Sequence, residues 1–153
     1  MGTDLKDGEF MQMCEAAKEQ SYDPYRQVGS VIVAIEGDVI STGTNRPPAA
    51  LKLSREESDM AIKADPNWRY FVLEHAERNA IRAAGTRSLA GATIYSSLFP
   101  CADCARAIAA AGIARVVTVP VIGANDDKKW EEHFHYARII FEKAGIEVDL
   151  LEA

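Results

Sequence analysis

The chain has no long hydrophobic run. None of its apolar stretches approaches the roughly 18 residues that a membrane-spanning helix needs. Residues Met1 to Asp7 also lack the basic start and the apolar core of a secretory signal peptide. These two absences argue against a membrane-spanning or secreted protein, and the expected location is the cytoplasm.

The chain also has no surplus of positive charge. Among its 153 residues, 17 Lys and Arg stand against 23 Asp and Glu, which gives a formal net charge of −6. Because proteins that bind nucleic acids usually present a basic face, this balance argues against a polynucleotide partner. A single phosphate needs only a local cation, so the expected partner is a small molecule.

Cysteine is scarce as well. The chain has three, Cys14, Cys101 and Cys104, which are too few for the disulfide framework of a small secreted domain. Cys14 falls on the apolar stripe of an expected helix over residues 5–19 and is expected in the core. Cys101 and Cys104 form a Cys-x-x-Cys pair, which in a reducing compartment is typical of a metal site or a redox site.

The remaining pattern predicts a single α/β domain over residues 1–153. The expected strands are 27–35, 39–44, 92–97, 114–119 and 146–150, and the expected helices are 5–19, 75–84, 102–111 and a long one that follows Asn125-Asp126-Asp127. Glu36-Gly37-Asp38 is typical of the turn of a β-hairpin between the first two strands. This order predicts a three-layer fold in which helices flank a five-stranded mixed sheet.

Residues 45–73 form a long connection within this pattern. Ser54 and Glu57 make a candidate capping box for a short helix that ends before Pro66. Connections of this length in a compact domain are often lids or binding loops. We therefore expect this segment to lie near a functional site.

Two short runs carry the candidate chemistry, His75-Ala76-Glu77 and Pro100-Cys101-Ala102-Asp103-Cys104. One imidazole and two thiolates can hold Zn²⁺ while its fourth position stays open to water, as in catalytic zinc sites. Both runs stand where a helix is expected to begin, and the positive end of a helix dipole favours thiolates there. Glu77 is too close to His75 along the backbone to share the same tetrahedron, so we expect it to face the open position and carry protons.

Two other interpretations of the Cys pair stay open. A Cys-x-x-Cys beside a βαβ pattern can serve thiol–disulfide exchange. A closed structural zinc would need a fourth ligand, for which Cys14, His133 and His135 are the candidates. His133 and His135 flank Phe134, which belongs to the apolar stripe of the last helix, so we expect both histidines at the surface or an interface.

The two runs and their flanks resemble the cytidine and deoxycytidylate deaminase superfamily, and most closely its deoxycytidylate branch. The strongest matches are His75 to Ile81 and Ser97 to Cys104, which contain the His-x-Glu and Pro-Cys-x-x-Cys signature of zinc deaminases. Weaker matches lie at Asp23 to Ser30, at Gly43-Thr44-Asn45 and at Ala144 to Val148. The resemblance implies a cytidine-deaminase-like fold with one zinc between two helices, and a dimer or higher oligomer.

The expected function is hydrolytic deamination of a cytosine-containing nucleotide of the deoxycytidylate type. Zinc bound by His75, Cys101 and Cys104 would lower the pKa of a water to about 7, and Glu77 would move protons between that water and the ring. The resemblance implies that Asn45 contacts the substrate. Ala76 and Phe99 are expected to border the base. Arg26 is the favoured cation for a 5′-phosphate, and Arg46, Lys52 and Arg55 are alternatives.

The chain also departs from the branch that it resembles. Arg46-Pro47-Pro48 follows Asn45 where the branch has Gly and one Pro, and the long connection lacks the ligands of a second zinc. The substrate is thus open to another small aminated heterocycle: a nucleoside, a free base such as guanine or cytosine, or a pterin- or triazine-like ring. Asp103 stands where the tRNA adenosine branch has Met, which argues against that branch. A zinc-stabilised module without turnover is the alternative outside enzymes.

Overall fold

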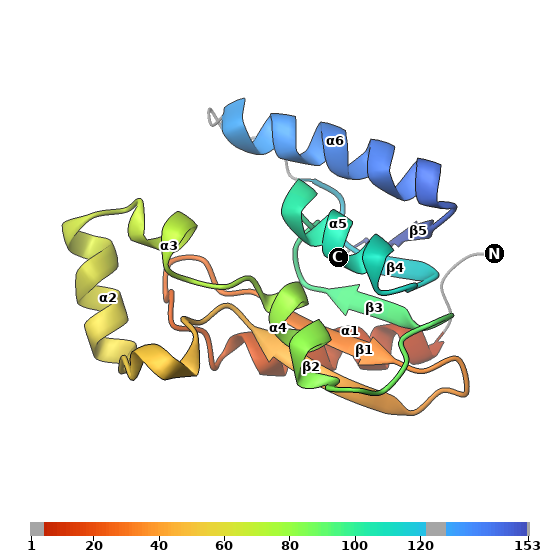
Figure 1. Ribbon diagram of the computed structural model, residues 1–153, viewed down its shortest axis with the longest axis horizontal. Helices are drawn as coiled ribbons and strands as arrows, with labels where there is room; N and C mark the ends of the chain where they lie inside the picture. Colours follow the sequence, from red (N-terminus) through yellow and green to blue (C-terminus); the bar gives the residue numbers. More distant parts are fainter. Residues whose placement is uncertain (1–4, 122–127, 153) are drawn as a thin grey trace.

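Five strands form one mixed sheet at the centre of the molecule. The computed structural model describes residues 5–121 and 128–152 (Figure 1). The strands are β1 (Gly29–Val33), β2 (Val39–Thr44), β3 (Thr93–Ser96), β4 (Arg115–Thr118) and β5 (Glu147–Leu150). Their order is β2-β1-β3-β4-β5, antiparallel around β1 and parallel from β3 to β5. The predicted sheet is confirmed.

Helices cover both faces of this sheet, which gives the three predicted layers. The helices that pack on the sheet are α1 (Leu5–Lys18), α4 (Ala76–Ala83), α5 (Ala102–Ala110) and α6 (Lys128–Ala144). One apolar cluster joins α1 to one face, and the other joins α4, α5 and α6 to the opposite face (Figure 1). No helix of the described chain is both long and apolar enough to cross a bilayer. Asn125-Asp126-Asp127, which the sequence places before the last helix, lie outside the described residues.

The central strand β1 is buried along its whole length, which explains its run of apolar residues. Val31 and Val33 pack with Cys14 of α1, while Ile32 between them packs on the opposite face. Cys14 is fully buried, as expected. Met13, its neighbour on α1, is 38% exposed, so the sheet covers only part of this helix.

The long connection contains three short helical pieces. They are η1 (Ala49–Leu51), α2 (Arg55–Ala64) and α3 (Trp68–Phe71). Ser54 Oγ accepts the Glu57 N–H and the Glu57 carboxylate accepts the Ser54 N–H, so the predicted capping box is confirmed. Figure 1 shows α2 and α3 at one end of the molecule, away from β4 and β5.

Gly43 allows α4 to pack closely on β2. A Cβ atom at this position would overlap the Ala76 carbonyl oxygen and would lie 2.5 Å from the Ala80 nitrogen. Because both neighbours are backbone atoms of α4, a side chain could not be accommodated by a change of rotamer. The absence of a side chain at Gly43 therefore determines how closely α4, including its first residues, packs on the sheet.

Candidate metal centre and substrate pocket

The two motif runs meet where α4 and α5 begin, as the sequence predicts. His75 is the N-cap residue of α4 and Cys101 is the N-cap residue of α5. His75 Nδ1 lies 3.3 Å from Cys101 Sγ and 3.4 Å from Cys104 Sγ. Two helix N-termini thus direct one imidazole and two thiols at a common point.

This donor set fits zinc. With Zn–S bonds of about 2.3 Å and Zn–N bonds of about 2.0–2.1 Å, a tetrahedron places neighbouring N and S donors about 3.6 Å apart. The observed separations, 3.3 and 3.4 Å, are close to that value. His75, Cys101 and Cys104 also form a group of potential ligand atoms that all lie within 4.8 Å of one another. The cluster is therefore consistent with a zinc site.

The candidates for a fourth ligand lie elsewhere. Cys14 is buried on α1 on the other side of the sheet, and His135 is exposed. His133 is closer, because its Nδ1 accepts the Ala102 N–H at 3.2 Å. It groups with Cys101 and Asp103, and among the described residues it does not join the three-donor group of His75. Within the described chain, the His75 group thus has three protein donors.

The two thiols of the cluster differ in protonation. The pKa of Cys101 is lowered because Cys104, and then His75, hydrogen-bond to its thiolate. The pKa of Cys104 is raised because its thiol donates that hydrogen bond and because the side chain is buried. One thiolate is therefore present without metal, and a bound cation would displace the proton of the other.

Glu77 lies beside this cluster with its two oxygens in different surroundings. Oε2 accepts a hydrogen bond from Ser96 Oγ at 2.9 Å, and Oε1 lies 3.6 Å from Cys104 Sγ. The side chain is 4% exposed. Burial, followed by the negative charge of Cys101, raises the pKa of Glu77 above its usual value. A carboxyl group with a raised pKa is suited to accept and return a proton near neutral pH.

One pocket opens onto the cluster and Glu77. Its lining contains all four predicted substrate residues: Arg26, Asn45, Ala76 and Phe99. Of the four predicted phosphate cations, only Arg26 lines it. Its guanidinium lies 4.0 Å above the ring of Trp130, at a distance typical of a cation–π contact. The pocket thus joins the donor group to an aromatic and cationic wall.

The Asn45 amide is already used by the protein. Its Oδ1 accepts from Ser21 Oγ at 2.6 Å and from the Val28 N–H at 3.1 Å. Its Nδ2 donates to the Arg26 carbonyl at 2.8 Å. Asn45 therefore holds the loop that carries Arg26, and the substrate contact implied by the resemblance can use only the amide's remaining hydrogen-bonding capacity.

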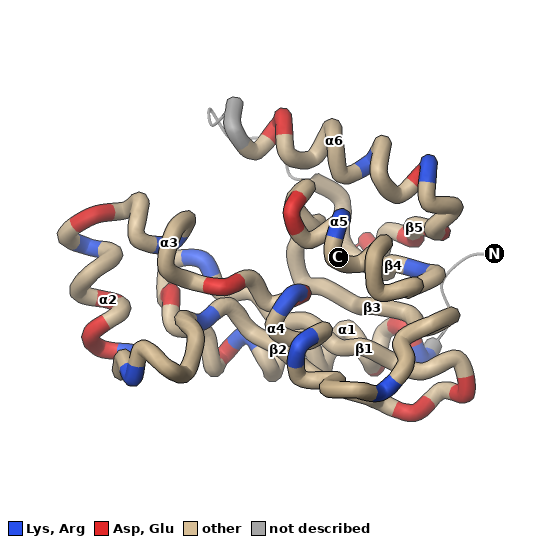
Figure 2. Tube along the Cα trace, viewed as in Figure 1, with Lys and Arg blue, Asp and Glu red and all other residues tan. Residues whose placement is uncertain are grey.

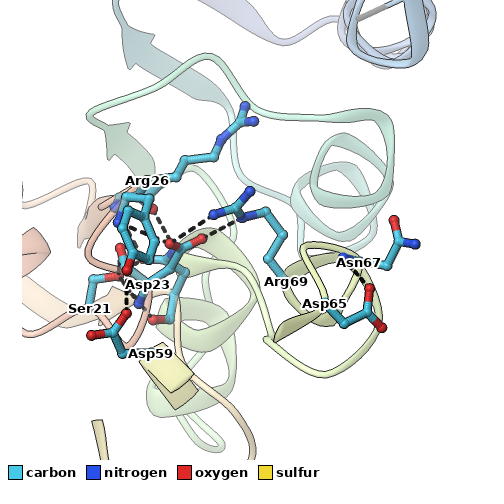
Figure 3. Close-up of polar contacts among 10 residues, drawn as sticks. Ser21, Asp23, Arg26, Asp59, Asp65, Asn67 and Arg69 are labelled. Carbon is cyan, nitrogen blue, oxygen red and sulfur yellow. Dashed lines mark hydrogen bonds and ion pairs between the residues drawn. The ribbon is translucent and has the colours of Figure 1, made fainter. Parts of the chain in front are cut away.

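Sequence reasoning missed another part of the pocket wall. Asp23, Arg69 and Tyr70 line the pocket, and Trp130 of α6 lines it too. Arg69 Nε lies 2.8 Å from Asp23 Oδ2, and its Nη2 lies 3.2 Å from Oδ1 (Figure 3). The only sign of this wall in the sequence was the cationic and aromatic run from Trp68 to Phe71. A run of four residues is too short to show the periodicity of a helix.

The fold of the chain is that of solved deaminases. The apo dCMP deaminase of cyanophage S-TIM5 superposes with a TM-score of 0.71 over 97% of this chain and 100% of the other, at 19% sequence identity. The same protein in complex with dCMP and dUMP gives a TM-score of 0.70 over 97% and 99%, at 21% identity. At such identities these likenesses establish the fold.

Sequence comparison adds the family. An uncharacterized deaminase from the luxG 3′ region of Aliivibrio fischeri is 34% identical over 142 residues, which cover 93% of this chain and 90% of the relative. The deoxycytidylate deaminase of Mus musculus is 32% identical over 139 residues, 90% of this chain and 74% of the relative. The family model described as the cytidine and deoxycytidylate deaminase zinc-binding region matches residues 5–120. The chain therefore belongs to this family of zinc-binding deaminases, which are hydrolases that act on C–N bonds.

Proposed function

We propose that the chain removes the amino group from the cytosine ring of a nucleotide of the deoxycytidylate type, with one zinc ion per chain, and releases ammonia and the uracil product. The observation that carries this proposal is the convergence of three donors, His75, Cys101 and Cys104, on one side of a pocket that also holds the buried Glu77 carboxylate. The dCMP and dUMP complex of the cyanophage relative supports the choice of substrate.

Glu77 would carry the protons. When zinc is bound at the three donors, it supplies a water of lowered pKa. Glu77 Oε1 would take a proton from this water and pass it to the ring nitrogen beside the amino-bearing carbon. The water oxygen would bond to that carbon, and Glu77 would then move the remaining proton of that oxygen to the amine, so that the C–N bond breaks and ammonia leaves. The oxygen remains as the ring carbonyl, so no organic cofactor is needed.

The pocket walls would hold the ring in place. Phe99 is 7% exposed and packs edge-on against Phe134, with 5.8 Å between ring centroids, so its position is fixed by the core. Ala76 is fully buried and has a side chain too small to compete with a flat ring for space. Arg26, stacked on Trp130, would provide the positive charge that contacts the phosphate of the substrate.

A substrate panel tests the proposal. Zinc-loaded protein is incubated with dCMP, CMP, deoxycytidine, cytidine, cytosine, guanine and a pterin, and ammonia release is measured beside zinc content. We expect dCMP to be the best substrate. Glu77→Gln keeps the side-chain shape and should abolish turnover, while Glu142→Gln, at an exposed position on α6, serves as control. Turnover of a free base or a pterin alone would favour the other heterocycles.

No turnover with any compound by zinc-loaded protein would contradict the enzymatic proposal and favour a zinc-stabilised module. A metal-free protein in which Cys101 and Cys104 cycle between thiols and a disulfide would favour the redox alternative. Elemental analysis separates this outcome from the others, because it reports the metal directly.

A further inference from the structure

Two arginines from distant segments reach the same pocket. Arg26 belongs to the loop before β1, and Arg69 belongs to α3 in the long connection. Both line the pocket that contains Glu77. Figure 3 shows the Arg69 side chain extending to the Asp23 carboxylate, while the Arg26 side chain extends away from that carboxylate. The pocket therefore carries a pair of cations that belong to neither zinc motif.

Arg69 is held in place by a buried carboxylate. Asp23 is 1% exposed, and Arg69 binds both of its oxygens, at 2.8 and 3.2 Å. Asp23 Oδ1 also accepts the Tyr25 N–H at 3.1 Å. A buried carboxylate without a partner is strongly destabilising, so this pair fixes where the guanidinium lies. The hydrogen bonds from Arg69 to Asp23 raise the pKa of Arg69 further, and the cation stays charged.

The segment that carries Arg69 is tied down at two more points. Tyr25 Oη donates to Asp59 Oδ1 at 2.7 Å, and Arg55 Nη2 donates to the Glu19 carbonyl at 2.8 Å. Asp59 and Arg55 both belong to α2, the helix before α3. Side chains of α2 and α3 therefore hydrogen-bond to residues 19–25, and these contacts hold α3, which carries Arg69, in position.

The charge of this part of the pocket suits one anionic group. Arg26 and Arg69 contribute two positive charges and Asp23 contributes one negative charge, so this part of the wall is net positive despite the acidic chain. Guanidinium groups match phosphate oxygens in geometry and in charge, and an arginine already fixed by a carboxylate loses little side-chain freedom on binding.

We propose that Arg69 forms, with Arg26, an anion subsite that selects substrates bearing a phosphate monoester, and that Asp23 is the residue that positions Arg69. The selected class is the mononucleotide, in preference to the nucleoside or the free base. This inference rests on the proposed deaminase function for its kinetic test, and it has a separate binding test.

The kinetic test compares dCMP with deoxycytidine. In Arg69→Gln, the ratio of kcat/KM for dCMP to kcat/KM for deoxycytidine should fall about 10- to 100-fold, mainly through KM, because one charge-assisted hydrogen bond is lost. Asp23→Asn should shift the ratio in the same direction by less, and it should add little to Arg69→Gln. A general loss of structure would lower both rates and leave the ratio constant.

Arg87 serves as the matched control. It pairs with Asp38 at 2.9 Å on the surface and lies outside the pocket. Arg87→Gln should keep the substrate ratio of the wild type. If Asp23→Asn fails to fold, Arg69→Lys replaces it, because lysine keeps the charge but lacks the fork that reaches both oxygens of Asp23.

The binding test uses calorimetry with dUMP and deoxyuridine on the zinc-loaded protein. Wild type should bind dUMP more tightly, and Arg69→Gln should lose about 10-fold or more of that preference. An equal affinity of wild type for both compounds, or a preference that Arg69→Gln leaves unchanged, overturns the anion subsite even if deamination occurs. Absence of turnover with a preserved, Arg69-dependent preference for dUMP overturns the deaminase proposal alone.

Discussion

Ser96 holds one oxygen of the proposed proton carrier. It is fully buried at the end of β3, and its Oγ donates to Glu77 Oε2 at 2.9 Å. Ser96→Ala leaves that oxygen without its partner, and a lost hydrogen bond to a charged group corresponds to about 1.5–3 kcal/mol. We expect kcat to fall about tenfold or more while the zinc content stays constant, because Ser96 touches no metal ligand candidate in the contacts described above.

The control for Ser96→Ala is Ser41→Ala. Ser41 is also buried and donates to the Ala80 carbonyl at 2.7 Å, but it does not contact Glu77. Its variant should lose stability with little change in kcat. Equal losses of kcat in the two variants would show that Ser96 acts through stability and not through Glu77.

The buried thiol of Cys14 should make the folded protein less stable at alkaline pH. Burial, and then the charges of Glu77 and Glu15, raise its pKa from 9.0 to about 12. Between these values the unfolded chain loses the thiol proton and the folded chain keeps it, so stability falls as pH rises, by about 1.4 kcal/mol per pH unit. Urea unfolding from pH 8 to 11 should show this decline in wild type, and Cys14→Ala should reduce the slope by about 1.4 kcal/mol per pH unit, while Cys104, whose pKa is also raised, keeps its own contribution. A parallel slope in the variant would assign it to other groups.

Zinc links two elements, α4 and α5. Their N-terminal residues supply all three donors, and a ligand that binds only the folded state adds to its stability. Chelation should therefore lower the midpoint of thermal unfolding and raise the number of thiols that react with a thiol reagent. His75→Ala should show both changes before chelation and little further response to it. A His75→Ala variant that binds zinc as well as wild type would contradict the donor assignment.

The contact between α4 and β2 depends on Gly43. An added Cβ would meet the backbone of α4 at Ala76 and Ala80, so Gly43→Ala must lift the helix that begins at His75. We expect the free energy of unfolding to fall by about 3 kcal/mol or more, together with weaker zinc binding. Gly8→Ala is the control: nothing lies within 4 Å of its Cβ, and Ala is favoured over Gly inside a helix by up to about 1 kcal/mol. Chemical denaturation and zinc titration measure both.

Elements that neighbouring residues encode could be predicted from the sequence, whereas the pocket wall formed by Asp23, Arg69 and Tyr70 could not. The capping box of Ser54 and Glu57, the β1–β2 hairpin and the two helix starts at the motifs are all encoded within a few neighbouring residues. The α3 helix has four residues and leaves no period. Arg69 is positioned at the pocket by its ion pair with Asp23, which lies 46 positions away in the sequence. No local sequence pattern predicts such a pairing.

At the scale of the whole molecule, the predicted sheet and its helical layers are confirmed, because both faces of the strands must be covered. An oligomer and a cytoplasmic location stay predictions. Size-exclusion chromatography with light scattering would report the first.

The charge distribution of the whole molecule predicts which anions it binds. The chain carries a net charge of −6, and Figure 2 shows basic residues interspersed with acidic ones along the elements. A polynucleotide binds through many phosphates at once and needs a continuous basic surface, whereas a mononucleotide needs only the local pair of Arg26 and Arg69. Fluorescence anisotropy at physiological salt should therefore detect no binding of labelled tRNA or single-stranded DNA by protein that binds dUMP in calorimetry. Micromolar tRNA binding that weakens steeply with salt would contradict this, and would mean that an assembly of several chains creates a basic surface that one chain lacks.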